Sequence, residues 1–271
     1  MSLGDGVSCA LGLQNSTVVK CWGNNLSGQL GQGDTNNRGD EANEMGDNLL
    51  PIDLGTSTPS QVSAGADHVC ANITTPNAAP NQFLQCWGDN TYGELGNGTT
   101  TSSNLPVAVS GLSGAKSISA GNGGLTCALL ADGTARCWGG NTYGALGNGT
   151  NFDAYTPVTV SSLTNATQIS AGWDHTCALL ATGKAKCWGG NAYGQLGNAT
   201  TVDHNKPVGV VSLSNATNIS AGYHFTCALL ATGKAKCWGN NASGQLGNAT
   251  TTNTSSPVAV TSLASATIIT S

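Results

Sequence analysis

The sequence predicts an all-β fold in which one small sheet is repeated five times along the chain. Three observations support this prediction. A segment of about 50 residues recurs five times, each copy consists of short apolar runs separated by turn residues, and each copy holds one pair of cysteines. A repeat of this length is typical of solenoids, propellers and arrays.

The copies begin at Met1, Val62, Ile118, Ile169 and Ile219, at intervals of 61, 56, 51 and 50 residues. The fourth reads ISAGWDHTCALLATGKAKCWGGNAYGQLGNATTVDHNKPVGV, and the fifth is nearly identical to it. Because the repeat is unbroken, we expect one domain over residues 1–271. Its repeats are 1–61, 62–117, 118–168, 169–218 and 219–271.

Each copy predicts four short strands. In the fourth copy, residues 169–172 form a brief strand that ends at glycine. Residues 176–180 and 184–189 flank Ala181-Thr182-Gly183, whose glycine suits the left-handed position of a hairpin loop. TCALL is apolar on both alternating faces, so it is expected to be covered on both sides; YGQLG and residues 207–211 supply the remainder. Small stacked sheets of this kind predict a β-propeller of four-stranded blades.

The cysteines support the hairpin independently. Directly opposed residues of an antiparallel pair lie about 4.5–5.5 Å apart at Cα, within reach of a disulfide. Zinc typically takes four ligands at close C-x2-4-C spacing, which this chain lacks; ten free thiols would rarely be spaced so regularly. We therefore expect five cross-strand disulfides, with one in each repeat: Cys9 and Cys21, Cys70 and Cys86, Cys127 and Cys137, Cys177 and Cys187, Cys227 and Cys237.

The ordered motifs AG-x-x-x-TCALL, CWG-x-N and GQLG resemble the regulator of chromosome condensation repeat family over essentially all of residues 1–271. The resemblance implies a β-propeller, usually of seven blades, that serves as a protein-binding platform. Family members include a nuclear guanine-nucleotide exchange factor and a secreted bacterial inhibitor of β-lactamases. This chain departs from the family pattern in having five copies and a cysteine pair in each, and the cysteine pairs argue against the nuclear role.

The composition argues against two classes of function, nucleic-acid binding and insertion into a membrane. Charged residues make up only 8% of the chain, the net charge is −5, and there is no basic run, so nucleic-acid binding is not expected. No apolar stretch approaches the roughly 20 residues of a membrane helix. Disulfides indicate an oxidising compartment, so we expect an extracellular or cell-surface location. Met1 already belongs to the repeat, so a removed leader or a longer parent protein is expected.

The sequence contains no recognisable set of catalytic residues. The position of His68 and His175 is taken by Phe225 in the fifth repeat, which indicates a structural role, and no nucleophile elbow accompanies them. The tryptophans after each second cysteine are expected to be packing residues. The acidic insertion at residues 31–55 lacks EF-hand spacing, so a solvated loop is favoured over a calcium site. We expect no enzyme activity, no metal and no cofactor.

Four glycosylation sequons occupy equivalent turns after GQLG and permit a glycosylated surface. They begin at Asn97, Asn148, Asn198 and Asn248. Further sequons, which composition alone could generate, begin at Asn15, Asn25, Asn72, Asn165, Asn215, Asn218, Asn241 and Asn253.

Binding residues are expected where the copies differ, because shared positions maintain the fold. Two segments vary: the residues after each AG, and the loop before each Pro-Val, which includes residues 202–206. Ordinary sequence drift among the copies would also explain this variation. Exposed aromatic residues there are typical of interface hot spots. The candidates are Asp67, His68, Trp173, Asp174, His175, Tyr223, His224, Phe225, Phe152 and Tyr155.

Three functions stay open. The first is a secreted or cell-surface propeller that binds a protein or glycan partner without enzymatic activity. The second is a structural segment of a longer extracellular repeat protein that self-associates into a fibre, matrix or surface appendage. The third is an intracellular regulator resembling the family's exchange factor. The repeat arithmetic fits a closed five-bladed ring as well as a piece of a longer array.

Overall fold

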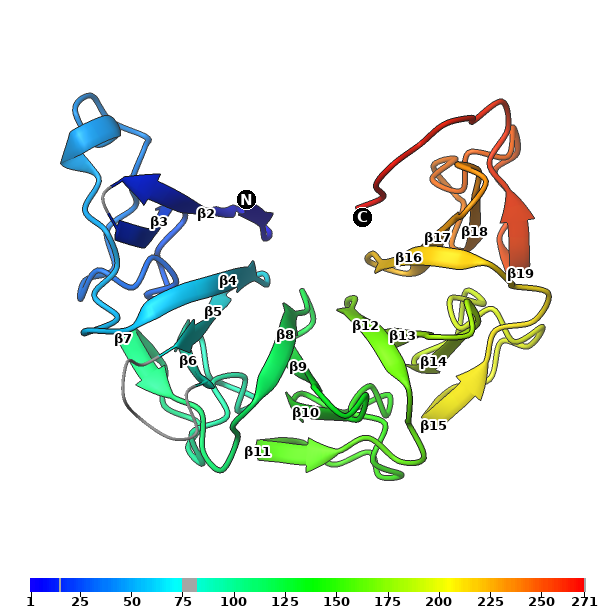
Figure 1. Cartoon of the computed structure of the whole chain (residues 1–271), viewed down its shortest axis with the longest axis horizontal. Helices are drawn as coiled ribbons and strands as arrows, with labels where there is room; N and C mark the ends of the chain where they lie inside the picture. The colour runs from blue at the N-terminus through cyan, green and yellow to red at the C-terminus, as the bar shows by residue number, and fades with distance from the viewer. Residues whose placement is uncertain (15, 75–81, 271) are drawn as a thin grey trace. The chain divides into compact units, whose positions relative to one another are not determined.

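The computed structural model describes residues 1–14, 16–74 and 82–270, and these residues form five β-sheets (Figure 1). In each sheet the strands pair in the order in which they follow one another along the chain. Contacts divide the chain into two compact units. Unit 1 comprises Met1–Ala131, Trp138–Gly140 and Asp153–Pro157; unit 2 comprises Asp132–Cys137, Asn141–Phe152 and Val158–Ser271. The single domain suggested by the sequence stays a prediction.

The strands follow the repeat pattern. Sheet 1 contains β1 (Ser2–Leu3), β2 (Val7–Gln14) and β3 (Ser16–Gly23); sheet 2 contains β4 (Thr58–Ala64), β5 (His68–Thr74), β6 (Gln82–Gly88) and β7 (Ser103–Ala108). Sheet 3 contains β8 (Ala115–Ala120), β9 (Leu125–Leu130), β10 (Ala135–Gly139) and β11 (Ala154–Thr159). Sheet 4 contains β12 (Ala166–Ala171), β13 (His175–Leu180), β14 (Ala185–Gly189) and β15 (His204–Gly209). Sheet 5 contains β16 (Ala216–Ala221), β17 (Phe225–Leu230), β18 (Ala235–Gly239) and β19 (Thr254–Ala259).

Helical structure in the described residues is limited to one 3-10 turn, η1 (Gly46–Asn48), and no described helix is long and apolar enough to span a bilayer. The longer loop expected between the cysteines of repeat 2 falls mainly on residues 75–81, and the sequon at Asn15 also lies outside the described residues.

Sheet 4 shows how the repeat sequence produces these strands. Residues 175–179 of β13 are buried on both faces, as the apolar pattern of TCALL predicts. Cys177 of β13 lies directly opposite Cys187 of β14. Gly183, in the turn between the two strands, has a φ of 71°, and its N–H donates to the carbonyl of Leu180. The predicted hairpin with a left-handed glycine is therefore confirmed.

The predicted disulfides are confirmed as well. All ten cysteines lie in the described part of the chain, and none of them is free. Cys127 and Cys137 are disulfide-bonded, and the other bridges join Cys9 to Cys21, Cys70 to Cys86, Cys177 to Cys187 and Cys227 to Cys237.

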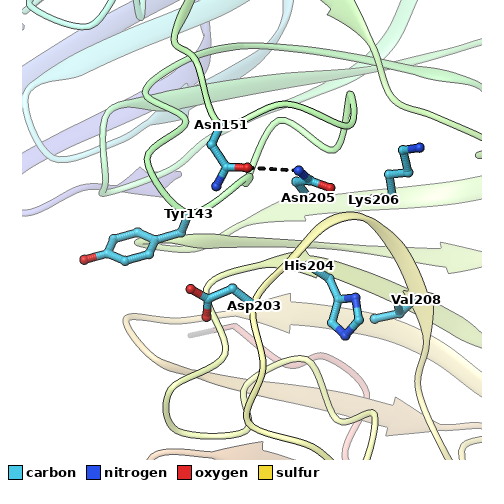
Figure 2. Close-up of a pocket in the computed structure, with 7 residues that line it drawn as sticks. All are labelled: Tyr143, Asn151, Asp203, His204, Asn205, Lys206 and Val208. Atoms are coloured by element: carbon cyan, nitrogen blue, oxygen red, sulfur yellow. Dashed lines mark hydrogen bonds between the residues drawn. The ribbon is translucent and has the colours of Figure 1, made fainter.

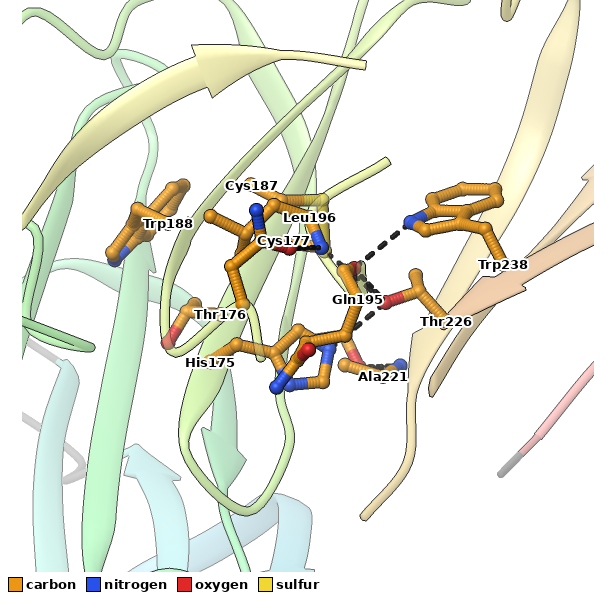
Figure 3. Close-up of a disulfide and its surroundings, with 12 residues drawn as sticks. His175, Thr176, Cys177, Cys187, Trp188, Gln195, Leu196, Ala221, Thr226 and Trp238 are labelled. Atoms are coloured by element: carbon orange, nitrogen blue, oxygen red, sulfur yellow. Dashed lines mark hydrogen bonds between the residues drawn. A yellow bond between two sulfur atoms is a disulfide. The ribbon is translucent and has the colours of Figure 1, made fainter. Parts of the chain in front are cut away.

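Tryptophans join consecutive repeats within each unit. In unit 2, Nε1 of Trp238 donates to the carbonyl oxygen of Gln195 at 2.9 Å (Figure 3). The same bond recurs between Trp188 and Ala145, Trp87 and Gln29, and Trp138 and Glu94. These four indoles are fully buried, which confirms their predicted packing role, whereas Trp22 is only half-buried.

Sheet 1 departs from the expected four strands, because its fourth strand is interrupted by the insertion. Gly23 forms an isolated bridge with Arg38, the equivalent of the pair between Gly189 and His204 in sheet 4. The N–H of Ile52 donates to the carbonyl of Val19, as the N–H of Val210 does to Ala185. The two ends of the pairing are therefore kept, and residues 39–51 replace the strand between them.

Candidate functional site

Three segments of unit 2 meet at one end of sheets 4 and 5. They are the turn between β12 and β13, the equivalent turn between β16 and β17, and the loop after β14. The two turns approach so closely that a Cβ on Gly172 would lie 2.5 Å from the carbonyl oxygen of Gly222. Only glycine fits at this position. The N–H of Trp173 donates to that same carbonyl at 3.3 Å.

These segments carry an aromatic cluster, which consists of Trp173, Tyr193, Tyr223 and His224. Ring centroids lie 4.5 Å apart for Trp173 and Tyr223, and 4.4 Å apart for Tyr223 and His224. Tyr193 stacks on His224 at 4.9 Å. Tyr223 is 52% exposed and Tyr193 is 38% exposed. The cluster therefore presents aromatic surface from rings that hold one another in place.

Asp174 lies beside the aromatic cluster. Its Oδ1 lies 3.5 Å from Nδ1 of His175 and 3.4 Å from Nδ1 of His224, and it accepts a hydrogen bond from Nε2 of Gln195 at 3.2 Å. Burial acts to raise the pKa of Asp174, but its contacts with His175, Gln195 and His224 outweigh burial and keep the pKa below its ordinary value of 3.8. Asp174 is therefore a carboxylate at neutral pH.

His175 is fully buried between sheets 4 and 5, so its ring is not available to a partner (Figure 3). Its Nε2 lies 2.8 Å from Oγ1 of Thr226, and the hydroxyl of Thr226 donates to the carbonyl of Gln195. Because that hydroxyl has only one proton, Nε2 of His175 must be the donor. His175 therefore positions its neighbours, in keeping with the structural role that the sequence predicts for it.

Unit 1 contains the equivalent residues of repeat 2. Nε2 of Gln29 donates to Asp67 at 3.1 Å, and Nε2 of His68 lies 2.8 Å from Oγ1 of Thr126. Burial lowers the pKa of His68 to about 4, so its imidazole is neutral. Burial and the nearby charges of Asp89 and Asp5 raise the pKa of Asp67.

Glu94 is an unusual buried carboxyl of unit 1. It occupies the position of Gln29 and Gln195, and its Oε2 accepts from the N–H of Tyr92 at 2.8 Å, as a glutamine oxygen does in those repeats. Repeat 3 has Gly124-Leu125 at the positions equivalent to Asp67 and His68, since the N–H of Gly140 donates to the carbonyl of Gly124 as that of Asp89 does to Asp67. Burial, with smaller contributions from Asp89 and Asp153, raises the pKa of Glu94 to about 7.

A polar pocket of about 280 Å³ lies elsewhere in unit 2 (Figure 2). The loop after β10 contributes Tyr143 and Asn151 to it, and the start of sheet 4's edge strand contributes the rest. Its lining residues are Tyr143, Asn151, Asp203, His204, Asn205, Lys206 and Val208. Residues 203–206 belong to the second variable segment that the sequence singles out.

The remaining candidates are not among the ring contacts that define the aromatic cluster. Phe152 is 81% exposed in unit 2, and Tyr155 is 47% exposed in unit 1, where it packs against Gly93. Phe225 takes the buried histidine position and packs near the disulfide of sheet 5. Within the described residues, no group of three or more His, Cys, Asp or Glu side chains could hold a metal ion. In the acidic insertion, Asp34 pairs with Arg38 at 2.6 Å.

The four equivalent sequons have a structural explanation. Oδ1 of Asn198 accepts both the N–H and the hydroxyl of Thr200, which closes a local turn. The same pair of bonds occurs at Asn97, Asn148 and Asn248. All four asparagines are half-buried, whereas Asn25, Asn72 and Asn241 are fully buried. Glycosylation of the four stays a prediction.

The structure adds two sets of residues that the sequence did not single out. The asparagine of CWG-x-N is a buried anchor: Nδ2 of Asn191 donates to the carbonyls of Thr200 and Val202, and its Oδ1 accepts from Leu196. Its recurrence in all five repeats was the available signal. Tyr193 and Gln195 were missed because they belong to GQLG-type motifs shared among repeats.

Comparison with known proteins shows the family. The model of the regulator of chromosome condensation (RCC1) repeat matches residues 19–71, 85–129, 132–179, 183–229 and 233–270. The chain therefore belongs to the RCC1 repeat family, and the predicted all-β propeller fold is confirmed. The ultraviolet-B receptor UVR8 of Arabidopsis thaliana is 32% identical over 176 residues, which are 63% of this chain and 36% of the receptor.

Three solved structures show the same fold. Human WBSCR16 has a TM-score of 0.77 at 21% identity over 95% of this chain and 65% of its own. Prp20p of Saccharomyces cerevisiae has a TM-score of 0.75 at 19% identity over 94% and 61%. The ectodomain of the Physcomitrella patens receptor kinase CR4 has a TM-score of 0.55 at 24% identity over 89% and 51%. The chain thus spans about a third of the curated relative and one half to two thirds of these structures.

Proposed function

We propose that the protein is a non-enzymatic, secreted or cell-surface propeller whose protein partner docks on the aromatic cluster. The observation that carries this proposal is the contact among Trp173, Tyr193, Tyr223 and His224, which come from three segments of two repeats. Tyrosine and tryptophan dominate interface hot spots, and rings already held by their neighbours lose little conformational freedom on binding.

The chemistry around the aromatic cluster suits a partner segment that carries arginine or lysine. Such cations bind over aromatic faces, and the carboxylate of Asp174 lies 3.4 Å from Nδ1 of His224, whose ring contacts Tyr223. The chain's net charge of −5 would favour encounter with a basic surface.

Relatives and cysteines support parts of the proposal. UVR8 is named a receptor, and Prp20p is described by its binding to Gsp1p and histones, so propellers of this family act through partners. A secreted or cell-surface location fits the five bridges, and CR4 carries a similar fold in a receptor ectodomain. An exchange-factor role has no support beyond the shared fold.

A double variant, Tyr193→Ser with Tyr223→Ala, tests the proposal. Serine is the residue at the Tyr193 position in repeats 1 and 5, so the fold tolerates it there. Phe152→Ala, which removes an exposed ring outside the aromatic cluster, is the matched control. Each form is used to capture proteins from the extracellular fraction of the source, and the dissociation constant of each purified partner is then measured.

We expect a partner that binds wild type and Phe152→Ala alike and the double variant at least tenfold more weakly, a loss of about 1.4 kcal/mol or more. Equal binding by all three forms would contradict docking on the aromatic cluster. Concentration-dependent polymers in sedimentation, without any captured partner, would favour the structural alternative.

A further inference from the structure

We propose that the pocket at the start of β15 binds a neutral sugar residue. Asp203, His204 and Asn205 line the pocket with Tyr143 and Asn151, and Figure 2 shows Asn205 joined to Asn151 and the ring of Tyr143 extending away from His204 and Asn205. The volume of about 280 Å³ is just below the roughly 300–1,000 Å³ typical of small-molecule sites, which suits a ligand as small as one sugar residue. This inference is independent of the aromatic cluster, because the two sites share no residue.

Hydrogen-bonding groups remain available in the pocket after the internal bonds are counted. Oδ1 of Asp203 accepts from the N–H of Asn191 at 2.7 Å, and Oδ2 has no partner among the described residues. Nδ2 of Asn205 donates to Oδ1 of Asn151 at 2.9 Å, which fixes the amide and leaves its oxygen as an acceptor. The side chains of His204 and Lys206 add donors without a described hydrogen-bond partner. The pocket therefore offers fixed acceptors and donors together.

This combination matches a polyhydroxylated ring better than an ion. Each sugar hydroxyl donates one hydrogen bond and accepts others, so it needs both kinds of group at short range. The carboxylate of Asp203 and the ammonium of Lys206 balance each other, which disfavours a strongly charged ligand. Tyr143 is 49% exposed and its ring extends away from these polar side chains (Figure 2), so it would have to turn about its side-chain bonds to cover an apolar C–H face of the sugar.

Comparison of repeats 4 and 5 points to the same residues. The two repeats are nearly identical up to this loop, but repeat 4 has Asp203-His204-Asn205-Lys206 where repeat 5 has Asn-Thr-Ser-Ser at residues 253–256. The backbone does not explain the change, because His204 pairs with Gly189 as Thr254 pairs with Gly239. The main-chain N–H of Asn191 is capped by Asp203 just as that of Asn241 is by Asn253.

Repeat 5 therefore supplies a matched variant for the test. His204→Thr, Asn205→Ser and Lys206→Ser together install side chains that the same strand already carries in β19. Tyr143→Ser is a second variant, since serine occupies that position in repeats 1 and 5. Tyr193→Ser with Tyr223→Ala serves as a control outside the pocket. Thermal unfolding establishes that each form is folded before binding is measured.

The probes are glucose, galactose, mannose, xylose and their neutral trisaccharides, titrated into the full chain and followed by NMR of the protein. We expect at least one probe to bind saturably with a Kd of about 1 mM or tighter, shifting signals of His204 and Asn205. Either pocket variant should weaken that binding at least tenfold, and the cluster variant should leave it unchanged. Inorganic phosphate should not compete.

Two results would overturn the proposal. One is that no neutral sugar gives a saturable shift at the pocket residues while the chain is folded. The other is that the shifts persist in both pocket variants, or that phosphate displaces the sugar. Because the cluster variant is measured in parallel, failure of this proposal is distinguishable from failure of the proposed protein-binding function.

Discussion

The indole of Trp238 and the main-chain carbonyl of Gln195 are joined by a hydrogen bond of 2.9 Å, and the hydroxyl of Thr226 donates to the same carbonyl. One backbone oxygen of repeat 4 thereby holds two side chains of repeat 5. Gly197 makes this possible, since a Cβ there would lie 2.7 Å from Nε1 of Trp238.

Replacement of Gly197 by alanine should therefore be strongly destabilising. The residue also has a φ of 64°, which alanine adopts at a cost. Displacement of the buried indole and the backbone strain together should lower the free energy of unfolding by about 2–4 kcal/mol. Urea denaturation of wild type and Gly197→Ala measures the difference.

Gly209→Ala is the control for that experiment. A Cβ on Gly209 meets nothing within 4 Å, and alanine occupies the equivalent position in β7 and β19. This variant should be neutral or more stable by up to about 1 kcal/mol, because alanine restricts the unfolded chain. Similar losses in both variants would show that contact with Trp238 is not the cause.

Removal of one hairpin disulfide should destabilise unit 2 without unfolding it at room temperature. Cys177 and Cys187 close a loop with a sequence separation of 10, and their replacement by alanine together should cost about 2–4 kcal/mol. Calorimetry with and without reductant measures the loss.

Intact mass provides a check on the bridges themselves, because reduction of five disulfides adds ten hydrogens. An unchanged mass on reduction would contradict the assigned pairing.

The fold was largely predictable because its signals are local and repeated. The hairpin around Gly183, the opposed cysteines and the buried TCALL strand all follow from periodicity and turn chemistry within one repeat. The fourth strand of sheet 1 was not predictable, since the insertion at residues 39–51 replaces the strand but leaves the bonds of Gly23 and Ile52 at its ends.

The candidate site was predictable only in part. Variation between repeats identified Trp173, Tyr223 and His224, but their ring contacts depend on the approach of Gly172 to Gly222, which is long-range. Tyr193 was missed because its position is shared by three repeats. Exposure also could not be inferred: His68 and His175 share the variable segment with the aromatic residues, yet their rings point into the packing between sheets.

The turn at Asn198 allows its structural and glycosylation roles to be separated. Asn198→Asp keeps the oxygen that accepts from Thr200 and removes the amide to which a glycan would be attached. The melting temperature of unglycosylated protein should change little, whereas Thr200→Ala should destabilise it by about 0.5–1.5 kcal/mol. If the native protein is glycosylated there, mass spectrometry should show loss of the glycan in both variants. A large destabilisation by Asn198→Asp would contradict the turn assignment.

Glu94 should make unit 1 less stable as the pH rises. Its folded-state pKa is about 7, above the ordinary value of 4.5, so the unfolded chain releases this proton first. Stability from this group is complete below pH 4.5, falls between pH 4.5 and 7, and is lost above pH 7. The full shift corresponds to about 3 kcal/mol. His68, whose pKa is lowered from 6.5 to about 4, acts in the opposite direction, because its stabilising effect is lost as the pH falls from 6.5 to about 4.

Glu94→Gln should isolate these opposing effects. Glutamine at the equivalent position of repeat 4 accepts from the N–H of Tyr193 as Glu94 does from Tyr92, so the turn is kept while the titration is removed. Relative to wild type, the variant should gain little at pH 4.5 and about 3 kcal/mol at pH 8. It should also expose the stabilisation by neutral His68 as a rise in stability between pH 4 and 6.5. Denaturant unfolding at these pH values measures both. An equal gain at pH 4.5 and pH 8 would mean that glutamine stabilises the turn by packing or hydrogen bonding, and not by removing a buried carboxylate.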